Sequence, residues 1–399
     1  MDYKEKSAKF IMNTYRRYPI TLVRGKGSYV YDDNDKAYLD FIAGIAVCSL
    51  GHCPAIIKDV LQKQADTLIH TSNLFYSVPQ IELSEFLCSK LPANERWKTF
   101  FCNSGAEANE AAIKLCRKYH SKKGRRRYEI ITFFNSFHGR TYGALSATAQ
   151  EKFHKGFEPM LEGFKYLPIN DIEVLKASIT ENTGAIMLET IQAEGGVNIV
   201  DKEFLDEVAK ICKEKDLLLV VDEVQTGLGR TGKLFSFQHF GIEPDIFTLA
   251  KGVAGGLPMG IMMAKGEVAD AFEPGNHAST FGGTPLVSAV ALEVVKRISD
   301  NDFLAEVEKK GNNLMNKLNL LKEKLPIKEV RGKGLLIGVE MDMEDASFIV
   351  QNAIAKGLLI NVTAGNVVRL VPPLTVSYLE IDEFIEKFIA AVDMKGVSK

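Results

Sequence analysis

Lys251 occupies a setting in which a lysine could do covalent chemistry. In the stretch PDIFTLAKGVAGGLPMG it follows an apolar run and precedes small residues. Burial in an apolar pocket lowers the pKa of a lysine, and the neutral amine that results can attack a carbonyl carbon. For a lone lysine, however, a surface position with the stem lying on apolar neighbours is the commoner explanation.

Two other stretches could supply an acid and a site for an anion. Asp222 ends the apolar run LLLVVD, and ligands of open α/β sheets bind at the carboxyl ends of strands. A carboxylate that caps a helix or braces the following loop is an equally good explanation of Asp222. Ser104 and Gly105, in NSGAEANEAAIKL, begin a helix whose free N–H groups suit a phosphate, although an ordinary helix N-cap is the simpler explanation of this pair.

Taken together, the lysine, the acid and the anion site match the needs of one cofactor, pyridoxal 5'-phosphate. That cofactor requires a lysine for its Schiff base, an acid paired with its pyridinium nitrogen and an anion site for its phosphate. The stretch NSGAEANEAAIKL is neither a Walker A loop nor a GxGxxG fingerprint, so it does not favour nucleotide binding.

These residues need a sheet and helices to bring them together. The middle of the chain alternates short apolar runs with amphipathic stretches, which is typical of a parallel sheet covered by helices. Helices are expected at 106–123 and 201–215. Strands are expected at KTFFCNS, YEIITFF, GAIMLET, DLLLVVDEV, PDIFTLA and MGIMMA.

The character of the chain changes after about residue 300, where a charged helical stretch at 303–325 leads to RGKGLLIGVEM, a helix near 346–356 and NVVRLVPPL. A chain of 399 residues is long enough for two domains. The sequence therefore predicts an α/β fold with a mostly parallel central sheet, plus a smaller α+β domain. The predicted parts are a segment 1–45 that packs with the small domain or a partner subunit, a large cofactor-binding domain 46–295 and a small domain 296–399.

Charge and composition exclude several classes of partner. Lys plus Arg total 49 and Asp plus Glu 51, which provides no general attraction to nucleic acid or to an anionic membrane. The N-terminus does not resemble a secretory signal and no apolar run reaches membrane-spanning length, so we expect a cytoplasmic protein. The six cysteines are scattered without metal-ligand spacing, and no metal site is predicted.

The motifs resemble those of the class III aminotransferases of fold type I. The resemblance rests on DEVQTGLGRTGK followed by PDIFTLAKGVAGGLPMG, and it extends through NSGAEANEAAIKL, SFHGRTYGALSAT, AEGGV and STFGGTPL. It covers nearly the whole chain.

The resemblance implies a set of cofactor contacts. Lys251 would bind pyridoxal 5'-phosphate covalently and then move a proton, Asp222 would keep the pyridine nitrogen protonated, and Gln225 would contact the phenolic oxygen of the ring. Phe137 would stack on the ring, and Thr280 would reach the phosphate from the neighbouring subunit, which implies a homodimer with shared active sites. The other implied contacts are Ser104, Gly105, Ala106, Glu223 and Val224.

Four further residues would bind substrates. Arg140 and Arg369 would hold substrate carboxylates, since arginine suits bidentate binding, and Ser279 would line the substrate site. Glu194 would pair with Arg369 when an acetylated substrate is bound and swing away for glutamate. Without the motif, an ordinary structural ion pair is the better explanation of Glu194 and Arg369.

Within the family, HTSNLFYSVPQIELSEFL and GNHASTFGGTPL imply a reaction of N2-acetylornithine with 2-oxoglutarate. The products would be N-acetylglutamate 5-semialdehyde and glutamate, in arginine biosynthesis, and N-succinyl-diaminopimelate is a further plausible donor. Ile45 stands where ornithine aminotransferases carry a tyrosine, which argues against free ornithine. The alternatives are a 4-aminobutyrate aminotransferase and an aminomutase of the glutamate-1-semialdehyde type.

The chain departs from the family pattern just before Glu194. Thr190 stands where the family usually has proline, and Ala193 stands where glycine is frequent. We expect these two changes to soften the loop that carries Glu194.

Overall fold

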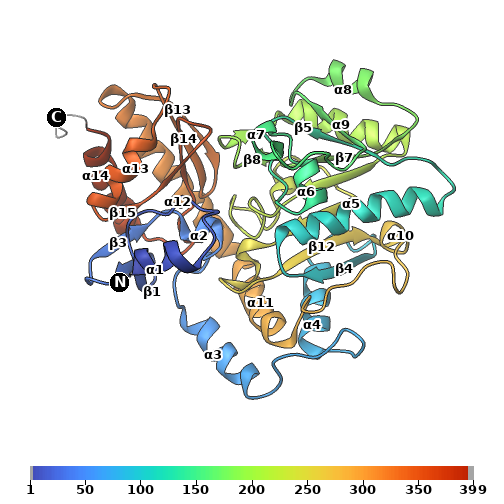
Figure 1. Cartoon of the computed structure of the whole chain (residues 1–399), viewed down its shortest axis with the longest axis horizontal. Coiled ribbons are helices and arrows are strands. Elements are labelled where there is room, and N and C mark those ends of the chain that lie inside the picture. The colour runs from blue at the N-terminus through green and yellow to red at the C-terminus, as the bar shows by residue number, and fades with distance from the viewer. Residues whose placement is uncertain (1–2, 394–399) are drawn as a thin grey trace.

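A seven-stranded sheet forms the centre of the computed structural model, which describes residues 3–393 (Figure 1). Neighbouring strands are parallel except at β12, which is antiparallel to the strand on each side. The mostly parallel sheet predicted from the sequence is therefore confirmed. In spatial order the strands are β4 (Trp97–Cys102), β12 (Gly260–Lys265), β11 (Ile246–Leu249), β10 (Leu218–Asp222), β7 (Thr183–Leu188), β5 (Glu129–Phe133) and β6 (Phe164–Leu167).

Helices cover both faces of this sheet, and the side chains of β10 alternate between the two. Leu218 and Val220 belong to the apolar cluster that includes α5, whereas Leu219 and Val221 belong to the main core. This alternation is the period of two that every strand has. The helices of this part are α3 (Ala55–Ala65), α4 (Val78–Cys88), α5 (Gly105–Lys122), α6 (Tyr142–Ala147), α7 (Glu151–His154), α8 (Ile172–Ser178), α9 (Lys202–Lys215), α10 (Gly266–Ala269), α11 (Pro285–Ile298) and the 3-10 helices η1 (Ser236–His239) and η2 (Lys251–Ala254).

Six strands end at one edge of the sheet, because β4, β5, β6, β7, β10 and β11 run in the same direction. The residues that follow all of these strands except β6 are those in which the sequence predicted chemistry. The helix α5 begins three residues after β4 ends, and η2 begins two residues after β11 ends. Ligands of open α/β sheets bind at this kind of edge.

The C-terminal part contains a second, antiparallel sheet with strand order β13-β14-β17-β16. Its elements are α12 (Asn301–Leu320), η3 (Leu321–Glu323), β13 (Ile327–Lys333), β14 (Leu336–Met341), α13 (Ser347–Ala355), β16 (Asn361–Thr363), β17 (Val367–Leu370) and α14 (Tyr378–Val392). The helix α11 runs through the predicted boundary at 295/296 and ends at Ile298. We propose that the large domain ends between α11 and α12.

The N-terminal segment joins the C-terminal part through a third sheet, β1-β2-β3-β15, in which β15 pairs with β3 in parallel. Figure 1 shows α1 (Tyr3–Phe10) and α14 on the side of the molecule that carries this sheet. Its elements are α1 (Tyr3–Phe10), β1 (Leu22–Lys26), β2 (Tyr29–Asp32), β3 (Ala37–Asp40), α2 (Ala43–Ala46) and β15 (Leu358–Leu359). In residues 3–393, no helix has both the length and the apolar character needed to cross a membrane.

Candidate active site

A cavity of about 460 Å³ lies at the edge where the parallel strands end. It brings together residues that are far apart in the sequence, and nine of the predicted site residues line it. These are Ser104, Gly105, Ala106, Phe137, Arg140, Asp222, Val224, Gln225 and Lys251.

Lys251 stands at the start of η2 with a left-handed backbone (φ 47°), a conformation that residues other than glycine adopt rarely. Burial lowers the pKa of its amine, and the nearby positive charge of Arg369 adds to this effect, although Glu194 and Asp222 oppose it. An amine whose charge is disfavoured in this way is suited to act as a nucleophile and a base. Strained backbone of this kind is common where a side chain must be held for function.

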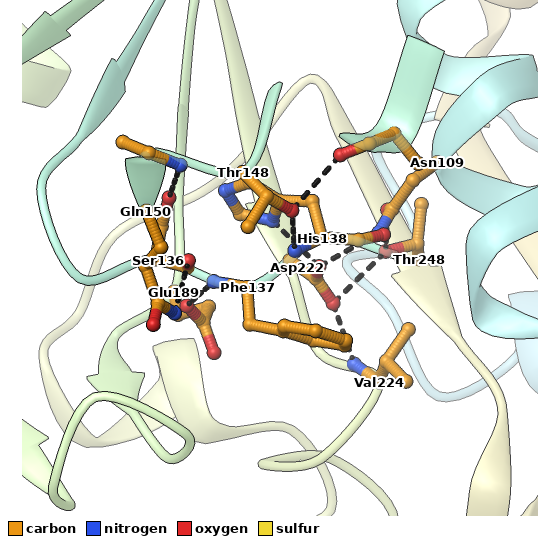
Figure 2. A network of polar contacts seen from close by, with 12 residues as sticks. Asn109, Ser136, Phe137, His138, Thr148, Gln150, Glu189, Asp222, Val224 and Thr248 are labelled. Atoms are coloured by element: carbon orange, nitrogen blue, oxygen red, sulfur yellow. Dashed lines mark hydrogen bonds and ion pairs between the residues drawn. The ribbon is translucent and has the colours of Figure 1, made fainter. Parts of the chain in front are cut away.

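Asp222 lies at the end of β10, with only 3% of its surface exposed. Its Oδ2 accepts hydrogen bonds from His138 Nδ1 and Asn109 Nδ2, both at 2.8 Å, and its Oδ1 accepts one from the Val224 N–H at 3.0 Å. Figure 2 shows these contacts together with Thr248, which pairs with Asp222 across β10 and β11. A buried carboxylate needs such donors, because burial otherwise disfavours its charge.

The start of α5 forms one wall of the cavity. Ser104 is its N-cap, and its hydroxyl accepts a hydrogen bond from the Glu107 N–H at 3.2 Å. The N–H groups of Gly105 and Ala106, ahead of it, have no partner within the helix. A Cβ at Gly105 would lie 2.7 Å from the Val224 side chain, so only glycine fits there. This wall suits a phosphate group, which helix N-termini favour through their N–H groups and dipole.

Glu189 is a second carboxyl in the cavity, and it follows β7 as Asp222 ends β10. Its Oε2 accepts a hydrogen bond from the Phe137 N–H at 3.0 Å. Burial, and then the negative charge of Asp222, raises the pKa of Glu189 well above its usual range. The cavity therefore holds one carboxyl with several donors and another whose charge is disfavoured.

An ion pair lies beside the cavity, between Glu194 and Arg369. Arg369, on β17, has only 1% of its surface exposed, and its Nη1 lies 2.5 Å from Glu194 Oε1. Gln225 bridges the pair, since its Nε2 donates to Glu194 Oε1 at 3.1 Å and its Oε1 accepts from Arg369 at 3.0 Å. Burial opposes the charge of Glu194, but Arg369 and Lys251 outweigh it and lower the pKa of Glu194.

Arg140 is exposed and stacks on an aromatic ring. Its guanidinium carbon lies 3.9 Å from the centre of the Phe153 ring and 5.4 Å from that of Phe137. Stacking fixes the plane of the guanidinium and leaves the donors around its edge for a ligand. Such an arrangement suits a carboxylate that enters the cavity above Phe137.

Glu223 differs from the expectation that it contacts the cofactor. It does not line the cavity, and its carboxylate instead accepts hydrogen bonds from Ser236, Thr226 and the Phe237 N–H. The physical reason is the alternation of β10, which directs residue 223 toward the opposite side from residue 222. Glu223 therefore braces the glycine-rich loop.

Ser279 and Thr280 line a different cavity, of about 920 Å³, near the segment that contains Asn73 and Gln80. Ser279 Oγ accepts a hydrogen bond from Asn103 Nδ2 at 3.2 Å, and Asn73 Nδ2 donates to the Ser279 carbonyl at 3.1 Å. Within one subunit, then, neither residue reaches the Lys251 cavity. A contribution from Thr280 to the site stays a prediction about a second subunit.

The loop that carries Glu194 is held more firmly than the sequence suggested. The Thr363 hydroxyl donates to the Glu194 carbonyl, and Arg331 Nη2 donates to the Gly196 carbonyl at 2.8 Å. Thr190, in place of the usual proline, shares a hydrogen bond with the Ser236 hydroxyl. Because the backbone is held on both sides of residue 194, a movement of Glu194 would be a movement of its side chain.

Reasoning from the sequence missed three residues of this site: Asn109, His138 and Glu189. Glu189 could have been found by the signal that identified Asp222, a carboxylate at the end of an apolar strand. His138 lies in the motif SFHGRT, in which the family resemblance implies roles for Phe137 and Arg140. Asn109 carries no local signal, because it lies in an alanine-rich helix whose packing on the sheet alone brings it to Asp222.

The residues of the cavity fit pyridoxal 5'-phosphate. Lys251 offers the amine, Asp222 offers a buried carboxylate for a ring nitrogen, and the wall at Gly105 offers N–H groups for a phosphate. The fold and this site define an enzyme that depends on that cofactor.

The chain belongs to the class-III aminotransferases, whose family model matches residues 10–392. A relative from Caldanaerobacter subterraneus subsp. tengcongensis, named acetylornithine aminotransferase, is 54% identical over 380 residues, covering 95% of this chain and 96% of the relative. The crystal structure of N-acetylornithine aminotransferase from Stenotrophomonas maltophilia K279a has 35% identity and a TM-score of 0.83, with 97% of this chain and 98% of that chain covered. A structure of ornithine aminotransferase from Toxoplasma gondii, described with partial occupancy of PLP at the active site, has 32% identity and a TM-score of 0.92, with 98% of this chain and 93% of that chain covered. The protein is therefore a pyridoxal-phosphate-dependent aminotransferase.

Proposed function

We propose that this aminotransferase moves the terminal amino group of N2-acetylornithine to 2-oxoglutarate, giving N-acetylglutamate 5-semialdehyde and glutamate, as a step of arginine biosynthesis. The observation that carries this substrate assignment is the Glu194–Arg369 pair, at 2.5 Å beside the cavity that holds Lys251. Relatives that bear the name acetylornithine aminotransferase, at 54% identity and below, support the same donor.

In the proposed mechanism the bound cofactor supplies an electron sink for the carbon that loses a proton. Lys251 would hold the cofactor through its amine and would move a proton at the reacting carbon of the donor. Asp222 would hold a proton on the ring nitrogen, and the start of α5 would hold the phosphate. Phe137 lines the same cavity and would pack against the ring.

Two donors must use the cavity in turn, and they differ at the end that reacts. N2-acetylornithine reacts at its terminal amine, with no carboxylate beside that amine, whereas glutamate reacts at its α-amine and brings an α-carboxylate. Arg140 holds the carboxylate at the far end of either substrate. Glu194 neutralises Arg369 for the first donor and leaves it for the second, so that Arg369 binds the α-carboxylate of glutamate.

The active site that we propose is completed by a second copy of the chain, which supplies Thr280 for the phosphate and Ser279 for the substrate. An exposed apolar surface beside the Thr280 loop supports a homodimer, since monomers rarely expose large contiguous apolar patches. Its residues are Leu68, Ile69, Leu74, Phe75, Tyr76, Val78, Ile81 and Phe281. We also propose that the protein is cytoplasmic. Its balanced charge supports the further proposal that it binds neither nucleic acid nor membranes.

A panel of amino donors tests the proposed function. With 2-oxoglutarate present, we expect the highest kcat/KM for N2-acetylornithine, lower values for N-succinyl-diaminopimelate and 4-aminobutyrate, and the lowest for ornithine. Lys251→Ala should lose turnover by at least about 1,000-fold, because the base is removed. The control Lys265→Ala removes a lysine that pairs with Asp245 at 3.6 Å outside the cavity, and it should keep the activity.

The panel also separates the alternatives. A higher kcat/KM for 4-aminobutyrate would favour the 4-aminobutyrate aminotransferase. Turnover that persists when 2-oxoglutarate is omitted would favour an aminomutase and would contradict the proposal.

A further inference from the structure

Asn109 is a buried side chain whose hydrogen-bonding capacity is fully used around Asp222 (Figure 2). Its Nδ2 donates to Asp222 Oδ2 at 2.8 Å and to the His138 carbonyl at 2.6 Å. Its Oδ1 accepts a hydrogen bond from the Thr248 hydroxyl at 2.8 Å. Both amide hydrogens and the amide oxygen therefore have partners.

The acceptors around Asn109 determine which way its amide points, and Thr248 holds the amide oxygen. The hydroxyl has one proton, and it lies closer to Asn109 Oδ1 (2.8 Å) than to Asp222 Oδ1 (3.4 Å). A flipped amide would place its oxygen against the Asp222 carboxylate and the His138 carbonyl, both of which are acceptors. The donor side of the amide must therefore face Asp222, whatever the assignment of its two atoms.

The fold explains why these three residues meet. On β10 and β11, Leu218, Val220 and Ile246 face α5, and the period of two along a strand puts Asp222 and Thr248 on that same face. The two are direct partners across the parallel strands. Asn109 lies on the buried side of α5, in its second turn, and so reaches both.

The position of Asn109 matters because the Asp222 carboxylate is buried beside other titratable groups. The titratable groups that face Asp222 are His138 from the loop after β5, Glu189 at the end of β7 and Lys251 after β11. Glu189 accepts a hydrogen bond from the Phe137 N–H. Asp222 accepts hydrogen bonds from Asn109, His138 and Val224, so its carboxylate is held by more donors than that of Glu189.

We propose that Asn109, held by Thr248, is a positioning residue that aims the carboxylate of Asp222 at the ring nitrogen of the cofactor. Asn109 acts through Asp222, and Thr248 acts through Asn109. This inference rests on the proposed function only in that Asp222 serves the cofactor, and it does not depend on which amino donor is used.

The test compares Asn109→Leu and Thr248→Val with the wild-type holoenzyme. We expect Asn109→Leu to lower kcat by about 10- to 100-fold with little change in KM, which is the range for losing one hydrogen bond to a charged group. The absorbance of the bound cofactor should change with pH at a higher midpoint than in the wild type. In Asn109→Leu the ring nitrogen would lose its proton more readily. A ring without that positive charge repels a proton at the Lys251 linkage less, so the linkage would keep its proton to higher pH.

Thr248→Val should shift kcat and the midpoint in the same direction but by less, and the double variant should match Asn109→Leu alone, because the threonine acts through the asparagine. The matched control is Thr132→Val, another buried strand threonine whose hydroxyl has no hydrogen-bond partner in the described residues. It should leave both readouts unchanged.

Three results would overturn the inference: an unchanged midpoint in Asn109→Leu, additive effects of the two substitutions, or equal shifts in Thr132→Val. Should Asn109→Leu fail to fold, Thr248→Val against Thr132→Val decides the question. The absorbance titration needs no amino donor, so its outcome stays separate from a failure of N2-acetylornithine as substrate.

Discussion

Glu189 and Glu194 lie in one short segment of the chain, yet their surroundings shift the pKa values of the two carboxyl groups in opposite directions. Glu189 is 5% exposed and lies near the Asp222 carboxylate, and burial and that charge raise its pKa. Glu194 lies against Arg369 at 2.5 Å, and although burial opposes its charge, Arg369 and Lys251 lower its pKa. Burial disfavours both charges, so the nearest strong neighbour decides the outcome.

The contrast separates two tasks within one cavity. At Glu189 and Asp222, a network of hydrogen bonds holds groups that every substrate needs. At Glu194, the backbone is held by Thr363, but the carboxylate is held mainly by Arg369 and Gln225, so one side-chain movement releases it. In the mechanism that we propose, the groups at Glu189 and Asp222 stay fixed, and the movement of Glu194 adjusts the site to each donor.

The largest effect that distinguishes the two glutamates should come from Glu194→Gln. Loss of the carboxylate leaves Arg369 charged for both donors. We expect kcat/KM for N2-acetylornithine to fall by about 10- to 100-fold and the value for glutamate to change little, because only the first donor needs Arg369 neutralised. Rates of the two half-reactions, measured separately, check this.

A matched control for that variant is Glu329→Gln, which removes a glutamate that pairs with Arg331 at 2.7 Å outside the cavity. It should leave both half-reactions unchanged. An equal loss with both donors in Glu194→Gln would mean that the pair is structural.

The free energy of unfolding should change with pH in opposite directions at the two glutamates. We expect this effect to be smaller than the change in kcat/KM. The raised pKa of Glu189 means that the native protein keeps a proton that the unfolded chain loses above about pH 4.5. Wild-type stability therefore falls as pH rises above that value, by up to about 1.4 kcal/mol per pH unit, and Glu189→Gln removes this loss. For Glu194 the lowered pKa has the reverse consequence, since its stabilising charge is lost as pH falls.

Unfolding of the cofactor-free variants in urea measures these slopes, at pH 5 and pH 8 for Glu189 and at about pH 3 and pH 5 for Glu194. Relative to the wild type, Glu189→Gln should gain stability as pH rises above 4.5, and the stability deficit of Glu194→Gln should shrink as pH falls below 4.5. Slopes of the same sign would show that the neighbouring charges do not control the two glutamates as described.

Much of the fold and of the site could be predicted from the sequence, because strand ends are local signals. Lys251 and Asp222 each follow an apolar run, and runs of that kind form the buried strands β11 and β10. The helix start at Ser104 has a capping residue that can be read directly. These signals identified three residues that the fold then places in one cavity.

What could not be predicted depends on how elements pack. Glu223 follows Asp222 directly, and its hydrogen bonds with Ser236 and Phe237 depend on where the segment after the glycine-rich loop packs. Asn109 reaches Asp222 because α5 crosses the face of the sheet that carries Thr248. The firmness of the Glu194 loop depends on Thr363 and Arg331, which belong to the other end of the chain.

The most direct test of the central claim is the distance between Glu194 Oε1 and Arg369 Nη1 with each donor bound. Crystal structures of the Lys251→Ala variant with the cofactor and either N2-acetylornithine or glutamate would provide it. The account predicts a hydrogen-bonded pair with N2-acetylornithine, near the 2.5 Å seen here, and a separated pair with Arg369 on the α-carboxylate when glutamate is bound. The same pairing with both donors would contradict it.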